Sequence, residues 1–338
     1  MTIRYTISLA VFLFAASQAS SQTIKSMPWQ NNCDSVLPES LNSEFITYKG
    51  GLEIINTQSE KFGGFSALWV SPDGSRILTF SDFTSVKESF PDSLRAQWYE
   101  FIPDYGESMQ LKSVSLNKSG RILSPEGIPV SEIESVAVHN KTLYIAKDNG
   151  KKQGNTILQV KLSEFDNAGD IHISPKAIPV PNFPKSSKEG FEAMTALPDG
   201  RLLLIHEKES DTKFRSTWLI NPKDTSFEKK LYKLNEGAAK GMTTLKNKDL
   251  LIIEKQYNKG YTKMAVSQLK QKDLKNDSLE AKTLLRAESF CLDNFEGIAS
   301  FTKNNKEYFF IITDNNGDWQ KPGRQKSLLL LFEYKSPQ

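Results

Sequence analysis

Acidic side chains recur at one position of a repeated sequence pattern. Five strand-like segments end in an acid: Asp82, Asp148, Glu207, Glu254 and Asp314. Three of the segments that precede them carry a glutamate near their start: Glu134, Glu192 and Glu296. Carboxylates that are packed together repel one another unless protons or cations lie between them. The pattern indicates a site for acid–base or cation chemistry if the fold brings these segments together.

The acids belong to a repeated hairpin. Residues 64–68 lead through a Pro-Asp-Gly turn into an apolar run at 76–82, and residues 190–207 follow the same plan. Three further copies have the same strand–turn–strand design. The copies align on Ser66, Glu134, Glu192, Lys240 and Glu296, in steps of 68, 58, 48 and 56 residues. Such steps match the length of a four-stranded propeller blade with its loops.

The sequence therefore predicts an all-β protein with the β-propeller fold. Six blades are favoured over five, with a sixth, degenerate blade between residues 83 and 132. The strand expected at 327–334 would pair with N-terminal strands at 45–48 or 52–55, closing the ring and covering the sheet edges. A β-sandwich is the second choice, because it does not explain hairpins of equal design. Short helices are expected only at 92–99 and 279–287.

In a propeller the innermost strands line the axis, so residues at equal repeat positions meet at one mouth of the central channel. Oxygen ligands without histidine or cysteine favour a hard cation, and a loose multi-blade ring suits Ca²⁺ better than Mg²⁺. The expected metal ligands are Asp82, Glu134, Glu192, Glu207, Glu254, Glu296 and Asp314. Lys147 and Lys255 lie beside the acids and would hold an anionic substrate. Taken singly, each acid is better explained as a solvated strand end or as the partner of a neighbouring lysine; only the recurrence argues for a site.

The N-terminus has the features of a secretory signal. Arg4 precedes an apolar stretch at 7–16 that is too short to span a bilayer, and small residues follow, with cleavage expected after Ala19 or Ser21. We expect residues 1–21 to be removed, residues 22–43 to form an N-terminal segment, and residues 44–338 to form a single domain. The location would be periplasmic or secreted, where Cys33 and Cys291 would form a disulfide.

Charge and hydropathy limit the partners. The chain has 43 basic and 40 acidic residues, a net charge of +3, and no basic stripe with interleaved aromatics of the kind that binds nucleic acid. No later segment is apolar enough to cross a membrane. The expected partner is a small-molecule anionic or ester substrate, bound by a monomer.

Several blocks resemble the bacterial phytase-like proteins with esterase-like activity. They are residues 191–194 (FEAM), 197–203 (LPDGRLL), 250–255 (LLIIEK), 293–298 (DNFEGI) and 313–316 (TDNN), followed by Gln325 and a leucine run. The resemblance extends over most of the chain after the signal. It implies a propeller, an exported location and a hydrolase of phosphate or other esters.

Three functions are compatible with these features. The leading hypothesis is Ca²⁺-dependent hydrolysis of a phosphoester or ester at the acidic mouth. The second is a non-catalytic binding module whose acidic ring holds a structural cation. The third is a calcium-dependent lactonase, which would share the site and differ in substrate.

Overall fold

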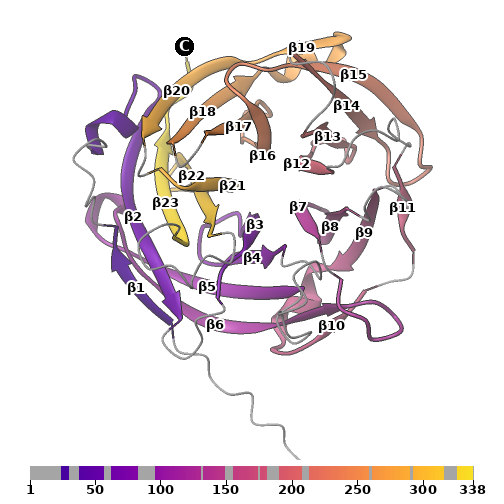
Figure 1. Ribbon diagram of the computed structural model, residues 1–338, viewed down its shortest axis with the longest axis horizontal. Helices are drawn as coiled ribbons and strands as arrows, with labels where there is room; N and C mark the ends of the chain where they lie inside the picture. The colour runs from indigo at the N-terminus through magenta and orange to yellow at the C-terminus, as the bar shows by residue number, and fades with distance from the viewer. Residues whose placement is uncertain are drawn as a thin grey trace, which may run out of the picture.

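The protein is a ring of β-sheets around a central axis (Figure 1). The computed structural model describes residues 24–29, 38–56, 62–82, 96–130, 132–148, 155–173, 176–180, 190–207, 213–258, 261–289, 292–315 and 326–337. These residues form five sheets, and the innermost strands contact one another in a closed circle. The all-β propeller is confirmed, with the blade count that the sequence left as the alternative.

The blades are numbered in the chain order of their innermost strands, and each is given from the axis outwards. Blade 1 contains β3 (Phe65–Val70), β4 (Ile77–Ser81), β5 (Gln97–Tyr105), β6 (Leu111–Leu123) and β10 (Ile171–His172). Blade 2 contains β7 (Ile133–His139), β8 (Thr142–Lys147), β9 (Thr156–Lys161) and β11 (Ile178–Pro179). Blade 3 contains β12 (Phe191–Ala196), β13 (Leu202–His206), β14 (Phe214–Ile220), β15 (Phe227–Lys233) and β19 (Ser278–Glu280). Blade 4 contains β16 (Ala238–Thr244), β17 (Leu250–Asn258), β18 (Tyr261–Leu269) and β20 (Lys282–Ser289). Blade 5 contains β21 (Asn294–Lys303), β22 (Lys306–Asp314), β23 (Leu328–Tyr334), β2 (Ile46–Asn56) and β1 (Ile24–Pro28). Short 3-10 helices are η1 (Pro38–Leu41), η3 (Glu107–Met109), η4 (Leu162–Asp166) and η5 (Gln271–Lys275).

The preference for six blades is wrong in the described part of the chain. Residues 97–123 do not form a sheet of their own, because β5 pairs with β4 and β6 pairs with β5, which extends blade 1. These two long strands account for the step of 68 residues between Ser66 and Glu134. The expected helices are also wrong where they are described, since residues 97–105 are β5 and residues 282–289 are β20.

The ring is closed by strands from the two ends of the chain. Strand β23 pairs with β2 over the register Ile46↔Tyr334 to Glu53↔Leu328, which confirms the closing pair expected from the sequence. One blade is therefore built from both ends of the chain. This arrangement covers two strand edges that would otherwise be open to pairing with other chains.

The hydrophobic core consists of clusters between neighbouring blades. In β23 the side chains of Leu328, Leu330 and Phe332 join the cluster between blades 4 and 5. Those of Leu329 and Leu331 join the cluster between blades 5 and 1. Successive residues of a strand face opposite sides of a sheet, so a strand that is buried on both sides needs an unbroken apolar run.

Two short strands fasten neighbouring blades to each other. After η4 the chain leaves blade 2 and adds β10 in parallel to β6 of blade 1. After η5 it leaves blade 4 and adds β19 in parallel to β15 of blade 3. Each crossing covers the outer edge of the preceding blade, so the blades are linked by backbone hydrogen bonds as well as by apolar contact.

Some expectations lie outside the described residues. They are the signal segment 1–21, Cys33 and Cys291, so the proposed cleavage and disulfide stay predictions. Residues 22–43, the expected N-terminal segment, are described only in part, and there they include β1. Among the described residues no helix is long and apolar enough to cross a membrane.

The turn at Gly74 provides a test of blade packing. Gly74 has φ +75°, and a Cβ there would overlap the ring of Phe301 in blade 5. Gly127 has a similar φ of +81° but no atom within 4 Å of a Cβ, so it is a matched control. We expect Gly127→Ala to lower the free energy of unfolding by about 1–2 kcal/mol through backbone strain alone. Gly74→Ala should cost about 1–3 kcal/mol more through overpacking, measured by urea denaturation. Equal losses would show that the turn does not pack tightly on blade 5.

Candidate functional site

Every inner hairpin has a β-bulge at the same place. The register between the first and second strands shifts in each blade, and the extra residue is Ser66, Glu134, Glu192, Lys240 or Glu296. These are the positions on which the repeats align in sequence. A bulge changes the direction of a side chain. Because the inner strands surround the axis, the bulged residues lie at one end of it.

The ammonium group of Lys240 lies among carboxylates from two other blades. Its Nζ is 2.6 Å from Glu207 Oε1, 3.4 Å from Glu192 Oε2 and 3.4 Å from Glu296 Oε2. All four side chains are at least nine-tenths buried. Burial by itself lowers the pKa of Lys240, but the attraction of Glu192, Glu296 and Glu207 outweighs it and raises this pKa well above its usual value. Lys240 is therefore a permanent cation in the cluster.

A second set of equivalent residues lies at the ends of the second strands. Each pairs with the residue two places before the bulge: Asp82 with Gly64, Asp148 with Glu132, Glu207 with Gly190, Lys255 with Ala238, and Asp314 with Asn294. Blade 4 thus contributes a lysine at both positions, and the other blades contribute acids or Ser66. The axial cluster is defined as Asp82, Glu134, Glu192, Glu207, Lys240, Lys255, Glu296 and Asp314.

Glu254, which the sequence grouped with these acids, does not share their register. Lys255 is the equivalent of Asp314 and contacts Glu296 Oε1 at 2.6 Å, as well as Asn294 Oδ1. Glu254 faces the opposite way, because successive strand residues alternate in direction. Its carboxylate accepts hydrogen bonds from the Tyr232 hydroxyl and from the backbone amides of residues 235 and 236. These contacts serve the fold and do not involve the axial cluster. The alignment of the repeats by sequence was therefore wrong by one residue in blade 4.

On the side of the cluster near blades 1 and 2, less of the negative charge of the acids is compensated by lysine. Burial, followed by repulsion from Asp314 and Glu296, raises the pKa of Asp82 well above its usual value. Burial and the charge of Asp82 likewise raise the pKa of Glu134, although Lys240 opposes the shift. Burial and the charge of Glu134 raise the pKa of Glu192. Asp82 and Glu134 are half-buried, so this side is the more accessible one.

Lys147 lies beside the cluster with two acids for neighbours. Burial lowers the pKa of Lys147, while the charges of Glu132 and Asp148 raise it and only partly cancel this effect. Burial, with the charge of Asp148, raises the pKa of Glu132 to about 7, although Lys147 opposes the shift. The sequence reading missed Glu132. It lies two residues before the bulged residue, at the position where blades 1 and 3 have glycine. Aligning the repeats at this position as well would have identified it.

Within the described ranges, no three histidine, cysteine, aspartate or glutamate side chains are grouped so that they could hold a metal ion by themselves. Part of the physical reason is that Lys240 occupies the space between Glu192, Glu207 and Glu296. The acidic members of the cluster nevertheless offer only oxygen donors, which is the donor chemistry of Ca²⁺.

The far end of the axis has a different character. A cavity of about 530 Å³ is lined there by inner-strand residues of all five blades, among them Trp69, Val136 and Phe301. Its hydroxyl groups bridge the blades: Thr195 lies 3.0 Å from Thr244. The axis is thus charged at one end and largely apolar at the other.

Comparison with known proteins identifies the family. Residues 60–317 match the family model described as "Phytase-like: Esterase-like activity of phytase". The chain belongs to this phytase-like family, and the resemblance noted in its sequence is confirmed.

The chain is similar to several solved structures at low sequence identity. An α-L-arabinofuranosidase from Clostridium thermocellum is 10% identical, with a TM-score of 0.46 over 78% of this chain and 87% of that one. A β-xylosidase/α-arabinofuranosidase from a compost metagenome is 8% identical, with a TM-score of 0.45 over 82% and 93%. The major allergen Mala s 1 of Malassezia sympodialis is 11% identical, with a TM-score of 0.40 over 87% and 88%. A search of curated proteins found no match.

The role of Lys240 can be tested by removing its charge. Lys240→Met leaves the buried Glu192, Glu207 and Glu296 without their shared cation, and we expect a loss of about 3–5 kcal/mol in the free energy of unfolding at pH 7.5. Adding Glu207→Gln should recover part of the loss. Lys306→Met, at a lysine whose side chain is 59% exposed, is the control and should lower the free energy of unfolding far less. A small loss for Lys240→Met would mean that the acids are not held by this ion pair.

The raised carboxyl pKa values predict the direction of the pH dependence. A carboxyl whose folded pKa exceeds its unfolded pKa of about 4 stabilises the fold below that unfolded value, and the contribution is lost as the pH rises through the folded pKa. For Glu132 this window ends near pH 7, and for Asp82, Glu134 and Glu192 it extends upwards from about pH 4. We therefore expect the metal-free protein to be less stable to urea at pH 8 than at pH 5. Asp82→Asn should flatten this dependence, whereas Asp104→Asn, at an exposed site, should not.

Proposed function

We propose that this protein hydrolyses an ester-type bond, in a phosphate ester or another ester of a small molecule, at the charged end of the propeller axis. The observation that carries the proposal is the gathering of acids from blades 1, 2, 3 and 5 around two lysines of blade 4. A purely structural role does not require charged residues at the equivalent bulge position of four of the five blades. Membership of the phytase-like family supports the same class of reaction.

The accessible carboxyl groups are suited to proton transfer. Hydrolysis adds water across the ester bond, so one proton must leave the attacking water and another must reach the departing alcohol oxygen. A raised pKa favours the protonated form of a carboxyl group, which can donate its proton. Asp82 and Glu134 have this property on the open side of the cluster. Ionised members of the cluster would accept the proton from water.

The two lysines that the sequence singled out would have different roles. Lys147 is half-buried at the open side and would bind the anionic part of the substrate. Lys255 is buried and bound to Glu296 and Asn294, so it would act as a positioning residue.

We also propose that a divalent cation such as Ca²⁺ assists. Asp82 and Glu134 on the open side, with the buried Asp314 whose charge acts on Asp82, would hold it together with water or substrate oxygens, since the described side chains do not form a complete site alone. When bound, the cation would neutralise these acids and polarise the ester group. Export to the periplasm or medium, where Ca²⁺ is available, and a monomeric state remain part of the proposal.

Two other functions remain as alternatives. A non-catalytic binding module is favoured by the burial of Lys240 among its acids, because that arrangement compensates their charge without any ligand. A lactonase would use the same groups on a cyclic ester, so only substrate preference separates it from the main proposal.

The test is turnover of an aryl phosphate, an aryl ester and a lactone. We expect activity on at least one of them, a loss of about 100-fold in kcat for Asp82→Asn, and no change for the exposed control Asp104→Asn. EGTA should reduce the activity and added Ca²⁺ should restore it. Turnover that persists unchanged in Asp82→Asn would exclude the proposed centre. Activity that survives complete chelation would exclude the cation, and no turnover with a Ca²⁺-dependent melting temperature would favour the binding module.

A further inference from the structure

A second charged region lies at the opposite end of the inner hairpins, between blades 3 and 4. A cavity of about 660 Å³ opens there. Its walls come from the turn between β12 and β13, the start of β15, the turn between β16 and β17, and the helix η5. Strand β12 runs from the axial cluster at Glu192 towards this turn, so the cavity and the cluster are separate.

The side chains around the cavity are mainly basic. Five bases line it: Arg201, Lys230, Lys248, Lys272 and Lys275. The two acids of the lining are already paired, Asp199 with Arg201 at 2.6 Å and Glu228 with Lys230 at 2.7 Å. In the part of the chain that the structure describes, the other three lysines have no ion pair. The cavity therefore carries excess positive charge.

Lys230 is an unusual residue among those that line the cavity. Its residue is only 2% exposed, and lysine is rarely buried to this extent. Its Nζ donates to Glu228 Oε1 at 2.7 Å and to the backbone oxygen of Asn276 at 3.1 Å. An ammonium group has three N–H donors, so one remains after these two contacts with described residues. A fixed cation of this kind loses little entropy when it binds an anion.

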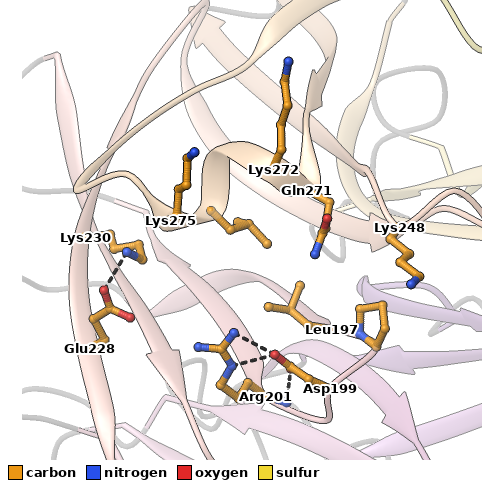
Figure 2. Close-up of a pocket in the computed structure, with 11 residues that line it drawn as sticks. Leu197, Asp199, Arg201, Glu228, Lys230, Lys248, Gln271, Lys272 and Lys275 are labelled. Carbon is orange, nitrogen blue, oxygen red and sulfur yellow. Dashed lines mark hydrogen bonds and ion pairs between the residues drawn. The ribbon is translucent and has the colours of Figure 1, made fainter.

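Polar groups from both blades face the same space. Figure 2 shows the Arg201 guanidinium and the Gln271 amide on opposite sides of the cavity, with Leu197 between them. Asp199 binds Arg201 through Nε and one terminal nitrogen, which leaves N–H groups on the other nitrogen. Asp249 accepts a hydrogen bond from the backbone amide of Gln271 at 3.0 Å and so holds the start of η5 in place.

We propose that this cavity binds a small molecule that carries a phosphate group. Arginine and lysine donors around a recess are the usual means of binding a phosphate, and the guanidinium suits two of its oxygens at once. Leu197, Pro198 and Leu274 would contact an apolar part of the same ligand. The inference does not rest on the proposed hydrolysis, because none of these residues belongs to the axial cluster.

Binding at this place would also fasten two blades together. The helix η5 precedes β19, which crosses from blade 4 to blade 3, and the other walls belong to both blades. A ligand that binds only the folded state stabilises it by RT ln(1 + c/Kd), where c is the free ligand concentration, so the melting temperature rises with the ligand concentration. The site thus predicts a thermal shift as well as direct binding.

The test uses phenylphosphonate, which has a phosphate-like group and an aromatic ring but no ester bond to cleave. Binding is measured by calorimetry at low salt, with benzyl alcohol as the uncharged comparison. We expect one saturable site per chain, a raised melting temperature and no binding of benzyl alcohol. The variant Lys248→Ala with Lys272→Ala, at two exposed lysines, should weaken binding by about tenfold or more.

The matched control is Lys112→Ala with Lys306→Ala, at two exposed lysines on blades 1 and 5. It removes the same net charge and should change the affinity by less than about twofold. The proposal is overturned if phenylphosphonate shows no saturable binding, if both double variants weaken it equally, or if the cavity variant leaves it unchanged. The last result would place the ligand elsewhere, for example at the axial cluster. Failure of ester turnover would leave all of these outcomes unaffected.

Discussion

The crowding of acids at one end of the propeller axis is the constraint on which the site depends. Equivalent residues of five blades must meet there, and most of them are carboxylates that burial and mutual repulsion make costly to ionise. Lys240 resolves the conflict on one side by lying among Glu192, Glu207 and Glu296. The other side, around Asp82 and Glu134, has no such lysine contact among the described residues, and it is also the more open side. The molecule thus has one half in which lysines partly compensate the charge of the acids, and an open half that is better suited to chemistry.

The bulges connect this electrostatic arrangement to the fold. A regular hairpin would alternate its side chains between the two blade interfaces, and a charged residue placed there would be buried among apolar clusters. The extra residue at Glu134, Glu192, Lys240 and Glu296 breaks the alternation once per blade, at the mouth. The apolar packing between blades can therefore remain continuous while the charges gather on the axis.

The two ends of the inner hairpins then have distinct tasks. At one end the strand termini bring charges together, whereas at the other end the turns pack on the neighbouring blade, as Gly74 does on Phe301. The turn end is also where the crossing between blades 4 and 3 leaves a recess with basic walls. Loops and turns on a rigid scaffold can vary without disturbing the core, so a second binding site at this end is compatible with the stability of the ring.

The sequence by itself determined the repeated hairpins, the closing strand and most members of the cluster, because these depend on local patterns of apolar residues, turn residues and equal repeat positions. Only the tertiary structure decided the blade count, since whether residues 97–123 form a new sheet or extend an old one depends on long-range strand pairing. It also decided that Lys255, and not Glu254, faces the axis. Side chains alternate along a strand, so a shift of one residue reverses the direction of each, and the bulge that sets this register is a feature of pairing between strands.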